Sequence, residues 1–267
     1  MTGFQGARVM IHQTAIIDPA AELDSDVEVG PYSIIGADVQ VGAGTVIGPH
    51  VVIKGPTRIG RNNRIFQFAS VGEDCQDKKY KGEPTRLEIG DDNVIRESVT
   101  IHRGTVQDNS LTRIGSGNLL MAYVHVAHDC MVGNHCVLAN NATLAGHVKV
   151  GDHVILGGFT GVHQFSRIGS YAMASLYSVV NMDIPAFMMV QGYPARARGM
   201  NVEGMRRRGY SKELIRTLRE AYRVLYRRGL TVEEALAAMR EQLPESPELT
   251  LFMDSIEASE RGIVRER

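Results

Sequence analysis

Six of the nine histidines in this sequence fall between positions 125 and 163, and histidine is the residue type best suited to proton transfer near neutral pH. The segment HVAHD (125–129) contains two of them, His125 and His128, and places Asp129 directly after the second. A carboxylate beside an imidazole can orient it as a general base. The residue types therefore predict acid–base chemistry, if the fold brings further groups to the same place.

The elements that must position these histidines have a six-residue period. Aliphatic residues recur at every sixth position from Ile11 to Val71, from Ile89 to Ile101 and from Ile114 to Val180, with Ala174 as the one small member. Such a period suits a short strand followed by a sharp turn, and the frequent Gly and Asn tolerate positive φ in turns. Three such faces make an 18-residue triangular coil. Ile11 to about Pro185 is therefore predicted to form a parallel β-helix of roughly nine coils, stacked at about 4.8 Å.

The 18-residue coil also predicts which side chains are neighbours along the stack. His128 should lie beside Gly146, Gly146 beside Gln164, and Asp129 beside His147, about 5 Å apart in each case. In that arrangement His128 would act as a base, Asp129 would orient it, and the backbone N–H of Gly146 would stabilise an oxyanion. The spacing thus predicts a catalytic group where the two histidine segments meet.

Two other interpretations of the histidines stay open. They could form a ladder of polar side chains on a solvated face of the repeat. Imidazoles from neighbouring coils could instead converge on a zinc ion and leave one coordination position open. The nearest pairs, His125 with His128 and His147 with His153, occupy different faces or positions of the coil, so no metal site is expected unless a second subunit completes it.

The repeat is interrupted at about residues 77–88 and 107–113, where the chain must leave the coil. The first insertion contains DKKYKGEPTRL, which is polar and basic and includes Gly82 and Pro84. Insertions in a regular repeat are frequently functional. On composition alone, this loop suits solvent as well as it suits a ligand.

The six-residue period ends near residue 200, and the chain beyond it has helical spacing. Residues 1–200 are predicted to form the β-helix and residues 201–267 a C-terminal helical domain, so the class is all-β with a helical tail. Ser211 is a candidate N-cap of a helix that stops at Gly229, and TVEE (231–234) has the form of a capping box. A third helix is expected from about Glu248 to Gly262.

Composition limits the functional classes. The 267 residues carry a net charge of −1 and include seven Phe and no Trp, so no basic, aromatic-rich surface for nucleic acid is expected. No run of about 18 apolar residues predicts membrane insertion, and the N-terminus lacks the pattern of a signal peptide, so a cytoplasmic location is expected. Cys75, Cys130 and Cys136 occupy the small fifth place of a hexad, which favours buried thiols over disulfides or metal ligands.

Five segments carry a specific combination of motifs: GEPTR (82–86), TIHRGTV (100–106), AHDC (127–130), LANNATLAGH (138–147) and NVEGMRRRG (201–209). Together they resemble the UDP-N-acetylglucosamine O-acyltransferase family, which begins lipid A biosynthesis, and the resemblance covers nearly the whole chain. It implies a left-handed parallel β-helix, an exception to the usual right-handed crossover. It also implies a homotrimer with active sites in the clefts between subunits.

The reaction implied by the resemblance is transfer of an (R)-3-hydroxyacyl group to the 3-hydroxyl of UDP-N-acetylglucosamine. The donor is acyl carrier protein, which carries the acyl group on its phosphopantetheine, and no metal, flavin or nicotinamide is implied. By motif match the general base is His128, with Asp129 beside it and Gly146 as the oxyanion donor. The 18-residue stack selects the same three residues.

The resemblance also assigns substrate contacts. Asp77 and Lys79 of the first insertion would lie near the glucosamine. Asn201, Glu203, Arg207 and Arg208 would hold the uridine diphosphate, and His102, His125, His147, His163 and Gln164 would line the cleft. An arginine guanidinium suits the diphosphate because it can pair with two phosphate oxygens at once. A solvated basic corner is the alternative for the arginines.

Two further features concern the acyl donor. Arg216, Arg219, Arg223 and Arg227 fall on one face of the first tail helix and form a candidate docking stripe for the acidic carrier protein, with ordinary solvation as the alternative. Leu176 aligns with the family's chain-length position, where some members have glycine. Leucine there should shorten the acyl groove and favour a shorter hydroxyacyl chain, unless Leu176 simply packs inside the coil.

Two other functional classes stay open. An enzyme that acts on a different sugar nucleotide, or on an amino group, would share the β-helix and the histidine. A non-enzymatic scaffold or ice-binding surface would explain the repeats without any need for His128, Asp129 and Gly146 to align. Flat threonine ladders would favour that class, and the exposed positions are mixed instead.

Overall fold

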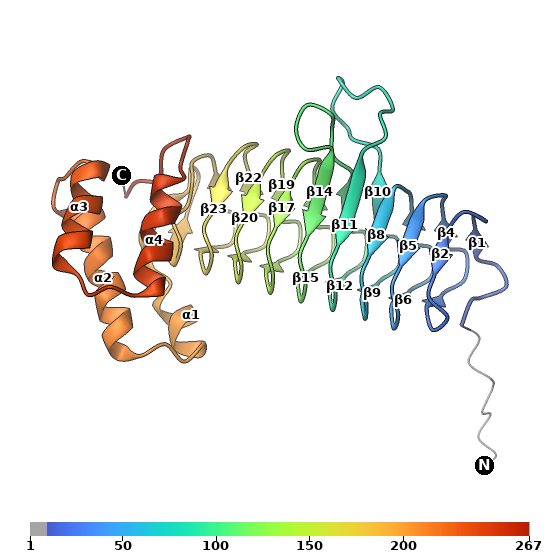
Figure 1. The fold of residues 1–267 in the computed structure, drawn as a ribbon, viewed down its shortest axis with the longest axis horizontal. Helices are drawn as coiled ribbons and strands as arrows, with labels where there is room; N and C mark the ends of the chain where they lie inside the picture. The colour runs from blue at the N-terminus through green and yellow to red at the C-terminus, as the bar shows by residue number, and fades with distance from the viewer. Residues whose placement is uncertain (1–9, 267) are drawn as a thin grey trace, which may run out of the picture. The chain divides into compact units, whose positions relative to one another are not determined.

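The computed structural model describes residues 10–266. They belong to two compact units, the first ending at Asp129 and the second beginning at Cys130. In each unit, short parallel strands stack as successive coils, and helices follow the last strands of the second unit (Figure 1). Within the described range, no helix combines the length and the hydropathy needed to cross a bilayer.

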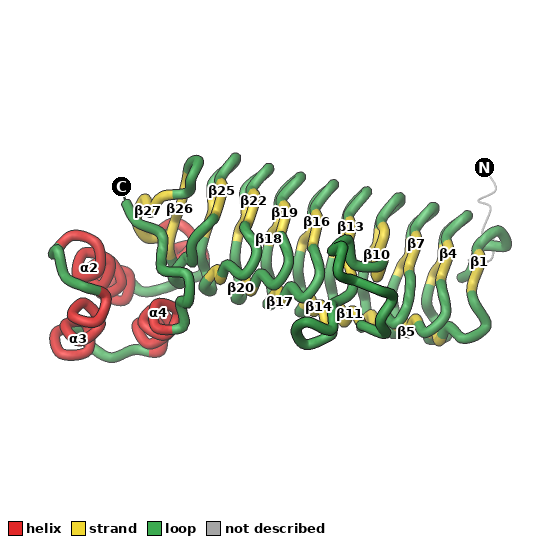
Figure 2. The backbone as a smooth tube through the Cα atoms, turned by 90° about the horizontal axis from the view of Figure 1, so that it is seen from above, coloured by secondary structure: helices red, strands yellow, loops and turns green. Residues whose placement is uncertain are grey.

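The first unit contains three parallel sheets, because each coil contributes one strand to each sheet (Figure 2). One sheet holds β1 (Ile16–Ile17), β4 (Ile34–Ile35), β7 (Val52–Ile53), β10 (Ser70–Glu73), β13 (Thr100–His102) and β16 (His125–Val126). The second holds β2 (Glu22–Leu23), β5 (Val39–Val41), β8 (Thr57–Ile59), β11 (Arg86–Ile89) and β14 (Leu111–Ile114). The third holds β3 (Glu28–Val29), β6 (Val46–Ile47), β9 (Arg64–Ile65), β12 (Val94–Ile95) and β15 (Leu119–Leu120).

The second unit repeats this construction and then departs from it. Its sheets hold β17 (Met131–Val132), β20 (Lys149–Val150) and β23 (Arg167–Ile168); β19 (Thr143–Leu144), β22 (Gly161–Val162) and β25 (Val179–Val180); and β18 (Val137–Leu138), β21 (Ile155–Leu156), β24 (Met173–Ala174), β26 (Met188–Gln191) and β27 (Arg196–Met200). The last two strands pair antiparallel. The six-residue period did not predict this hairpin, because a hairpin has no place in the hexad pattern.

The register of the strands confirms the 18-residue coil. Ile17 pairs with Ile35, and Val150 pairs with Ile168. The aliphatic residue of most hexads points into the coil, so Ile35, for example, is 1% exposed, whereas Ile11 in the first described coil is 44% exposed. Burial of one such side chain stabilises the fold by about 1.5–3 kcal/mol. The three cysteines are buried thiols, as predicted from their place in the hexad.

The turns between strands go beyond the sequence prediction. Positive φ was expected for Gly and Asn and is found, for example, at Asn62, but Tyr32, His50 and Phe68 also adopt it, with φ of 59°, 53° and 64°. Their rings stack along one corner, with centroids 5.2 and 5.6 Å apart. A backbone hydrogen bond from His50 N to Pro31 O, 2.9 Å long, joins successive turns of this corner. These contacts offset a conformational cost of about 1–2 kcal/mol per residue.

The insertions leave the coil between β10 and β11, at residues 74–85, and between β13 and β14, at residues 103–110. Both segments begin and end a few residues before the predicted limits, because the strands after them resume at Arg86 and Leu111. Three buried asparagines carry the stack past the insertions. Asn93 N donates to Asn63 Oδ1, and Asn118 N donates to Asn93 Oδ1, each at 2.9 Å.

Four helices follow the strands of the second unit: α1 (Val202–Arg207), α2 (Lys212–Arg227), α3 (Val232–Gln242) and α4 (Pro247–Glu257). The predicted caps of α2 and α3 are confirmed, since Ser211 accepts from Leu214 N–H and Thr231 forms a complete capping box with Glu234. The change from β-helix to helices thus falls between Met200 and Val202.

Two helical features differ from the prediction. α4 ends at Glu257, short of Gly262, because the Ser259 hydroxyl donates to Asp183 Oδ2 at 2.7 Å and the chain turns back towards the strands. α1 was not predicted. Asn201 caps it by accepting a hydrogen bond from Gly204 N.

Candidate functional site

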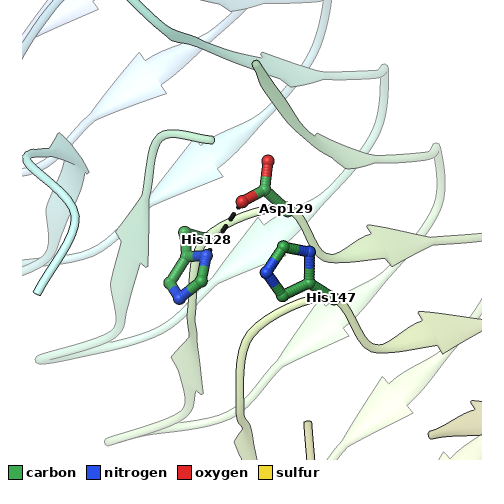
Figure 3. Close-up of side chains that lie close together, drawn as sticks. All are labelled: His128, Asp129 and His147. Carbon is green, nitrogen blue, oxygen red and sulfur yellow. Dashed lines mark hydrogen bonds and ion pairs between the residues drawn. The ribbon is translucent and has the colours of Figure 1, made fainter. Parts of the chain in front are cut away.

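The pair of His128 and Asp129 lies in the turn that follows β16. His128 Nδ1 is 2.8 Å from Asp129 Oδ2 (Figure 3, which also draws His147 of the second unit). The side chain of His128 is 13% exposed and that of Asp129 is 1% exposed. When Nδ1 donates its proton to the carboxylate, Nε2 is the ring atom left to accept a proton or bind a metal ion. This arrangement therefore leaves Nε2 of His128 available for such chemistry.

A threonine of the second insertion holds this aspartate. The backbone N–H of Thr105 donates to Asp129 Oδ1 at 2.9 Å and to Oδ2 at 3.1 Å, and its hydroxyl donates to Oδ2 at 2.6 Å. The backbone N–H of Asp129 donates to the hydroxyl of Thr112 in β14 at 2.8 Å. A buried carboxylate needs such donors to remain ionised. Asp129 is thus fixed before any substrate arrives.

Two more of the predicted cleft histidines come together in the first unit. His102 of β13 and His125 of β16 have ring centroids 5.0 Å apart, and His125 Nδ1 is 2.7 Å from the Thr100 hydroxyl. Burial, followed by the neighbouring His125, lowers the pKa of His102 to about 4. Burial and the nearby His128 also lower the pKa of His125. Near neutral pH, both rings are uncharged hydrogen-bonding groups.

The insertion at residues 74–85 carries Asp77 and Lys79 on its exposed part. Lys79 N donates to Asp77 Oδ1 at 2.9 Å, and Asp77 N donates to Cys75 Sγ at 3.2 Å. Both charged side chains are therefore exposed to solvent, and the hydrogen bonds around them join residues of the same loop. This is a suitable place for contacts with a polar ligand.

The remaining residues predicted to line the cleft, together with Gly146, belong to turns of the second unit. Gly146 is buried and His147 is half-buried after β19, and His163 and Gln164 are exposed after β22. The ring of His147 stacks on that of Phe165, with centroids 4.4 Å apart. The second unit thus brings these four residues to two consecutive turns of one corner.

The four residues predicted to hold the diphosphate lie in and around α1. Glu203 and Arg207 are exposed and form an ion pair of 3.2 Å, and Arg208 lies over the ring of Tyr171. Asn201 is different, because it is 4% exposed and its amide Nδ2 donates to Tyr171 O at 3.0 Å while Oδ1 caps α1. Its side chain therefore has a structural role.

Leu176 lies in the turn after β24 and is 58% exposed. A Cβ atom added to Gly158, one coil earlier, would lie 3.1 Å from Leu176 Cδ1. The interpretation that Leu176 packs inside the coil is therefore wrong. The side chain covers an outer surface where a ligand chain could lie.

The arginine stripe on α2 is partly neutralised within the chain. Arg223 pairs with Glu220 at 2.7 Å and Arg227 pairs with Glu266 at 2.8 Å. Arg216 and Arg219 form no ion pair with any residue between 10 and 266, and they line a surface hollow together with Arg206, Lys212, Ile215 and Arg223. The unpaired positive charge is thus concentrated at the N-terminal half of α2.

The chain is similar to curated proteins along nearly its whole length. It is 62% identical over 256 residues to the acyl-[acyl-carrier-protein]–UDP-N-acetylglucosamine O-acyltransferase of Stutzerimonas stutzeri, a match that covers 96% of this chain and 99% of that protein. The chain belongs to the UDP-N-acetylglucosamine O-acyltransferase family. The protein of the same name from Pseudomonas paraeruginosa is 60% identical over the same shares of the two chains.

Family models and solved structures agree with membership of this acyltransferase family. Residues 183–264 match the family model "Udp N-acetylglucosamine O-acyltransferase; Domain 2", and residues 111–146 match "Bacterial transferase hexapeptide (six repeats)". LpxA from Acinetobacter baumannii has a TM-score of 0.95 at 58% identity, covering 96% of this chain and 100% of that one. The UDP-N-acetylglucosamine O-acyltransferase of Moraxella catarrhalis has a TM-score of 0.94 at 52% identity over the same shares. The predicted left-handed parallel β-helix with C-terminal helices is confirmed, and the protein is an acyltransferase.

Sequence reasoning missed the residue that holds Asp129 beside His128 and the residue that anchors the loop with Asp77 and Lys79. Thr105 bonds to Asp129, and Arg103 bonds to the loop. Both lie in the motif TIHRGTV, which was used only to identify a resemblance and to select His102. The position of Thr105 at the edge of an insertion could have suggested that it contacts a polar site. The 18-residue spacing could not pair Thr105 with Asp129, because the insertion between them makes their separation 24 residues.

Proposed function

We propose that this protein transfers an (R)-3-hydroxyacyl group from acyl carrier protein to the 3-hydroxyl of UDP-N-acetylglucosamine, the first step of lipid A biosynthesis. The observation that carries the proposal is the buried pair of Asp129 and His128, which leaves Nε2 of the imidazole to accept a proton. A sugar hydroxyl is a poor nucleophile, so a base that removes its proton during attack supplies what the reaction needs.

In the proposed mechanism His128 Nε2 takes the proton of the 3-hydroxyl while the oxygen attacks the thioester carbonyl. The backbone N–H of Gly146 stabilises the oxyanion, a role that rests on the 18-residue period of the sequence. The C–S bond then breaks, and the imidazolium gives its proton to the departing phosphopantetheine sulfur. Asp129 stabilises the imidazolium between these two steps. No acyl-enzyme forms, and no metal, flavin or nicotinamide takes part.

The acceptor contacts follow from the same assignment. Asp77 and Lys79 contact the glucosamine, and the neutral rings of His102 and His125 line its pocket. His147, His163 and Gln164 line the rest of the cleft, and Arg207 and Arg208 with Glu203 hold the uridine diphosphate. Asn201 contributes through the cap that it provides to α1, which positions the two arginines.

The proposal includes a homotrimer with active sites between subunits, in the cytoplasm. Exposed apolar side chains in the first unit support subunit contact. Ile16 is 63% exposed and Ile34 42% exposed on one sheet, and the rings of Tyr32 and Phe68 project from the corner beside it at 61% and 62%. A row of this kind is costly to leave in water. A second and third copy of the chain would cover it.

The experiment uses purified protein, UDP-N-acetylglucosamine and 3-hydroxyacyl carrier proteins of graded chain length, with product followed by mass spectrometry. Transfer that persists in excess EDTA and disappears in His128→Ala supports the donor, the acceptor, the base and the metal-free mechanism. Loss of transfer in EDTA would indicate instead that His128 is a ligand of a metal ion that the reaction needs. Transfer only to a 3-amino analogue of the sugar nucleotide would replace the proposed acceptor atom.

A further inference from the structure

We propose that the segment Arg103–Gly104–Thr105 positions both parts of the reaction centre: Arg103 fixes the loop that carries Asp77 and Lys79, and Thr105 fixes the carboxylate that orients His128. The proposal deepens the function proposed above and rests on it. The segment directly follows β13 and contains none of the residues that contact substrate in that proposal.

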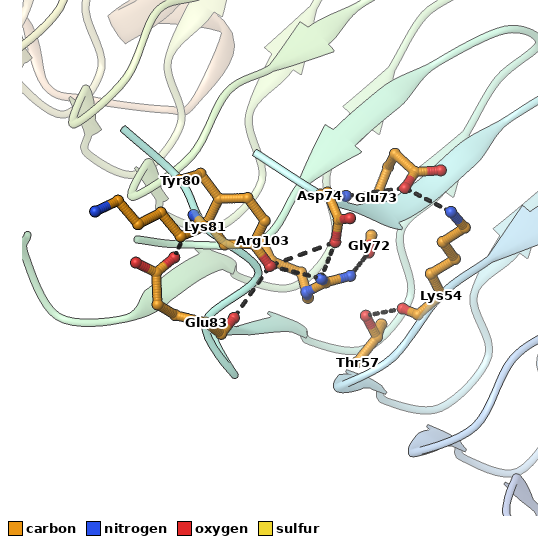
Figure 4. A network of polar contacts seen from close by, with 9 residues as sticks. All are labelled: Lys54, Thr57, Gly72, Glu73, Asp74, Tyr80, Lys81, Glu83 and Arg103. Carbon is orange, nitrogen blue, oxygen red and sulfur yellow. Dashed lines mark hydrogen bonds and ion pairs between the residues drawn. The ribbon is translucent and has the colours of Figure 1, made fainter. Parts of the chain in front are cut away.

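Arg103 ties together the beginning, the middle and the end of the loop at residues 74–85. Its Nη1 donates to Gly72 O at 2.5 Å, just before the loop, and its Nη2 donates to Asp74 Oδ1 and to the Tyr80 hydroxyl, the latter at 3.0 Å (Figure 4). The Tyr80 hydroxyl in turn donates to Glu83 O at 3.0 Å. A planar guanidinium can make these bonds at once, and a lysine ammonium cannot span them.

The burial of Arg103 shows that the arrangement is an anchor. Its side chain is 7% exposed, which is rare for a charged residue without a specific partner. Asp77 and Lys79, by contrast, are exposed and bond to neighbours within the loop. Their location relative to β13 therefore depends on the guanidinium more than on packing of their own.

Gly104 allows the segment to pass close to β14. A Cβ atom at this position would lie 2.2 Å from the backbone nitrogen of Leu111, which no side chain could tolerate. The backbone is thus held tightly between Arg103 and Thr105. The two side chains leave it towards different partners, the loop in one case and Asp129 in the other.

The Thr105 hydroxyl and His128 both contact the same carboxylate oxygen of Asp129. It donates to Asp129 Oδ2 at 2.6 Å, and the same Oδ2 lies 2.8 Å from His128 Nδ1. The hydroxyl therefore fixes the rotation of the carboxylate and shares the negative charge of this oxygen. Within the first unit, the titratable groups around the pair include His102, His125 and Cys75.

The test of Arg103 separates acceptor binding from chemistry. In Arg103→Lys, and more weakly in Tyr80→Phe, we expect the KM for UDP-N-acetylglucosamine to rise about tenfold, with kcat and the KM for the acyl donor changed by less than about twofold. Trypsin should cut at Lys78, Lys79 and Lys81 faster in both variants, because the loop has lost its anchor. The control is Arg113→Lys, since Arg113 is 57% exposed and pairs with Glu88 on the outer surface.

The test of Thr105 uses a variant of the same shape. In Thr105→Val we expect kcat to fall about tenfold while both KM values stay unchanged, because a hydrogen bond to a charged group is lost from the base but not from the binding contacts. The acidic limb of the kcat profile should move to higher pH, since Oδ2 then carries more charge towards His128. Thr105→Ser should restore both quantities. The control is Thr45→Val, a fully buried threonine whose hydroxyl donates to Gly60 O at 3.0 Å.

The outcomes distinguish this inference from the proposed function. A loss of kcat in Arg103→Lys with unchanged KM for the sugar nucleotide would overturn the role of Arg103. An equal loss at every pH in Thr105→Val, without rescue by serine, would reduce Thr105 to a structural residue. If Arg103→Lys does not fold, Tyr80→Phe decides. If the unmodified protein transfers no acyl group, the proposed function fails, and unchanged tryptic cutting would show separately that Arg103 is no anchor.

Discussion

The ring of His102 lies edge to face with the ring of His125, with 5.0 Å between the two centroids. The two residues belong to adjacent strands of one sheet, and burial lowers the pKa of each. Two neutral imidazoles can share this space, whereas two imidazolium ions would repel one another. The relationship makes this face of the coil polar without making it charged, and it has a consequence for stability.

The fold should lose stability in mild acid through His102. Its pKa is about 4 in the folded chain and about 6.5 when unfolded, so below pH 6.5 the unfolded chain binds the proton first. The free energy of unfolding should therefore fall by about 2 kcal/mol between pH 7 and pH 5 from this residue. Urea titrations at the two pH values measure it. His102→Gln should remove most of this pH dependence, and the half-buried His12→Gln should leave it intact.

Removal of the base should slow transfer strongly without unfolding the protein. We expect His128→Ala to lower kcat by about 10²- to 10⁴-fold, because general base catalysis is lost. Asp129→Asn should lower kcat by at least about tenfold. The amide can donate a hydrogen bond to Nδ1 and so hold His128 in the wrong tautomer, and it is a poorer acceptor for Thr105. Single-turnover assays and melting curves separate the two effects. Full activity in His128→Ala would refute the assignment.

The side chain of Leu176 should limit the length of the acyl chain. Leu176→Gly frees the outer surface above Gly158, so the preferred donor should become longer by about two methylenes. At about 0.8 kcal/mol for each buried methylene, this is on the order of a fifteen-fold change in relative kcat/KM. Competition between carrier proteins with different chains measures it. Leu176→Met, which keeps the volume, should retain the original preference, and an unchanged preference in the glycine variant would exclude a role in chain length.

The two unpaired arginines of α2 should act on the protein donor alone. Arg216→Gln combined with Arg219→Gln should raise the KM for acyl carrier protein by about tenfold at low salt and by less at high salt, where charges are screened. The KM for the sugar nucleotide should not change. The matched control is Arg240→Gln, because Arg240 lies on α3 and pairs with Glu257. A rise in both KM values would point to a disturbed fold.

The coil and two of the helices could be predicted from sequence because the rules that form them are local. Most hexads bury their own aliphatic residue, and Ser211 and Thr231 cap helices within three residues of themselves. The corners could not be predicted in this way. His50 adopts positive φ because rings from the coils on both sides stack on it, and those rings are 18 residues away in the chain.

The site was only partly predictable for a related reason. His128 and Asp129 are adjacent in sequence, so their pairing was accessible, whereas Thr105 and Asp129 are separated by 24 residues, which is no multiple of the 18-residue coil. Asn201 shows what a motif match leaves out. The motif suggested a ligand contact, which stays a prediction, whereas the position directly before a helix, where asparagine is a favoured cap, explains the burial of its side chain.

The asparagine ladder of Asn63, Asn93 and Asn118 spans the two coils that carry the insertions. Its members are separated by 30 and 25 residues, and yet the next strand resumes in register. The length of a loop is thereby independent of the pitch of the stack. Such a stack can accept an insertion of different length while its core stays the same. An engineered exchange of either loop should therefore keep Arg103 and Thr105, which connect the insertions to each other and to Asp129.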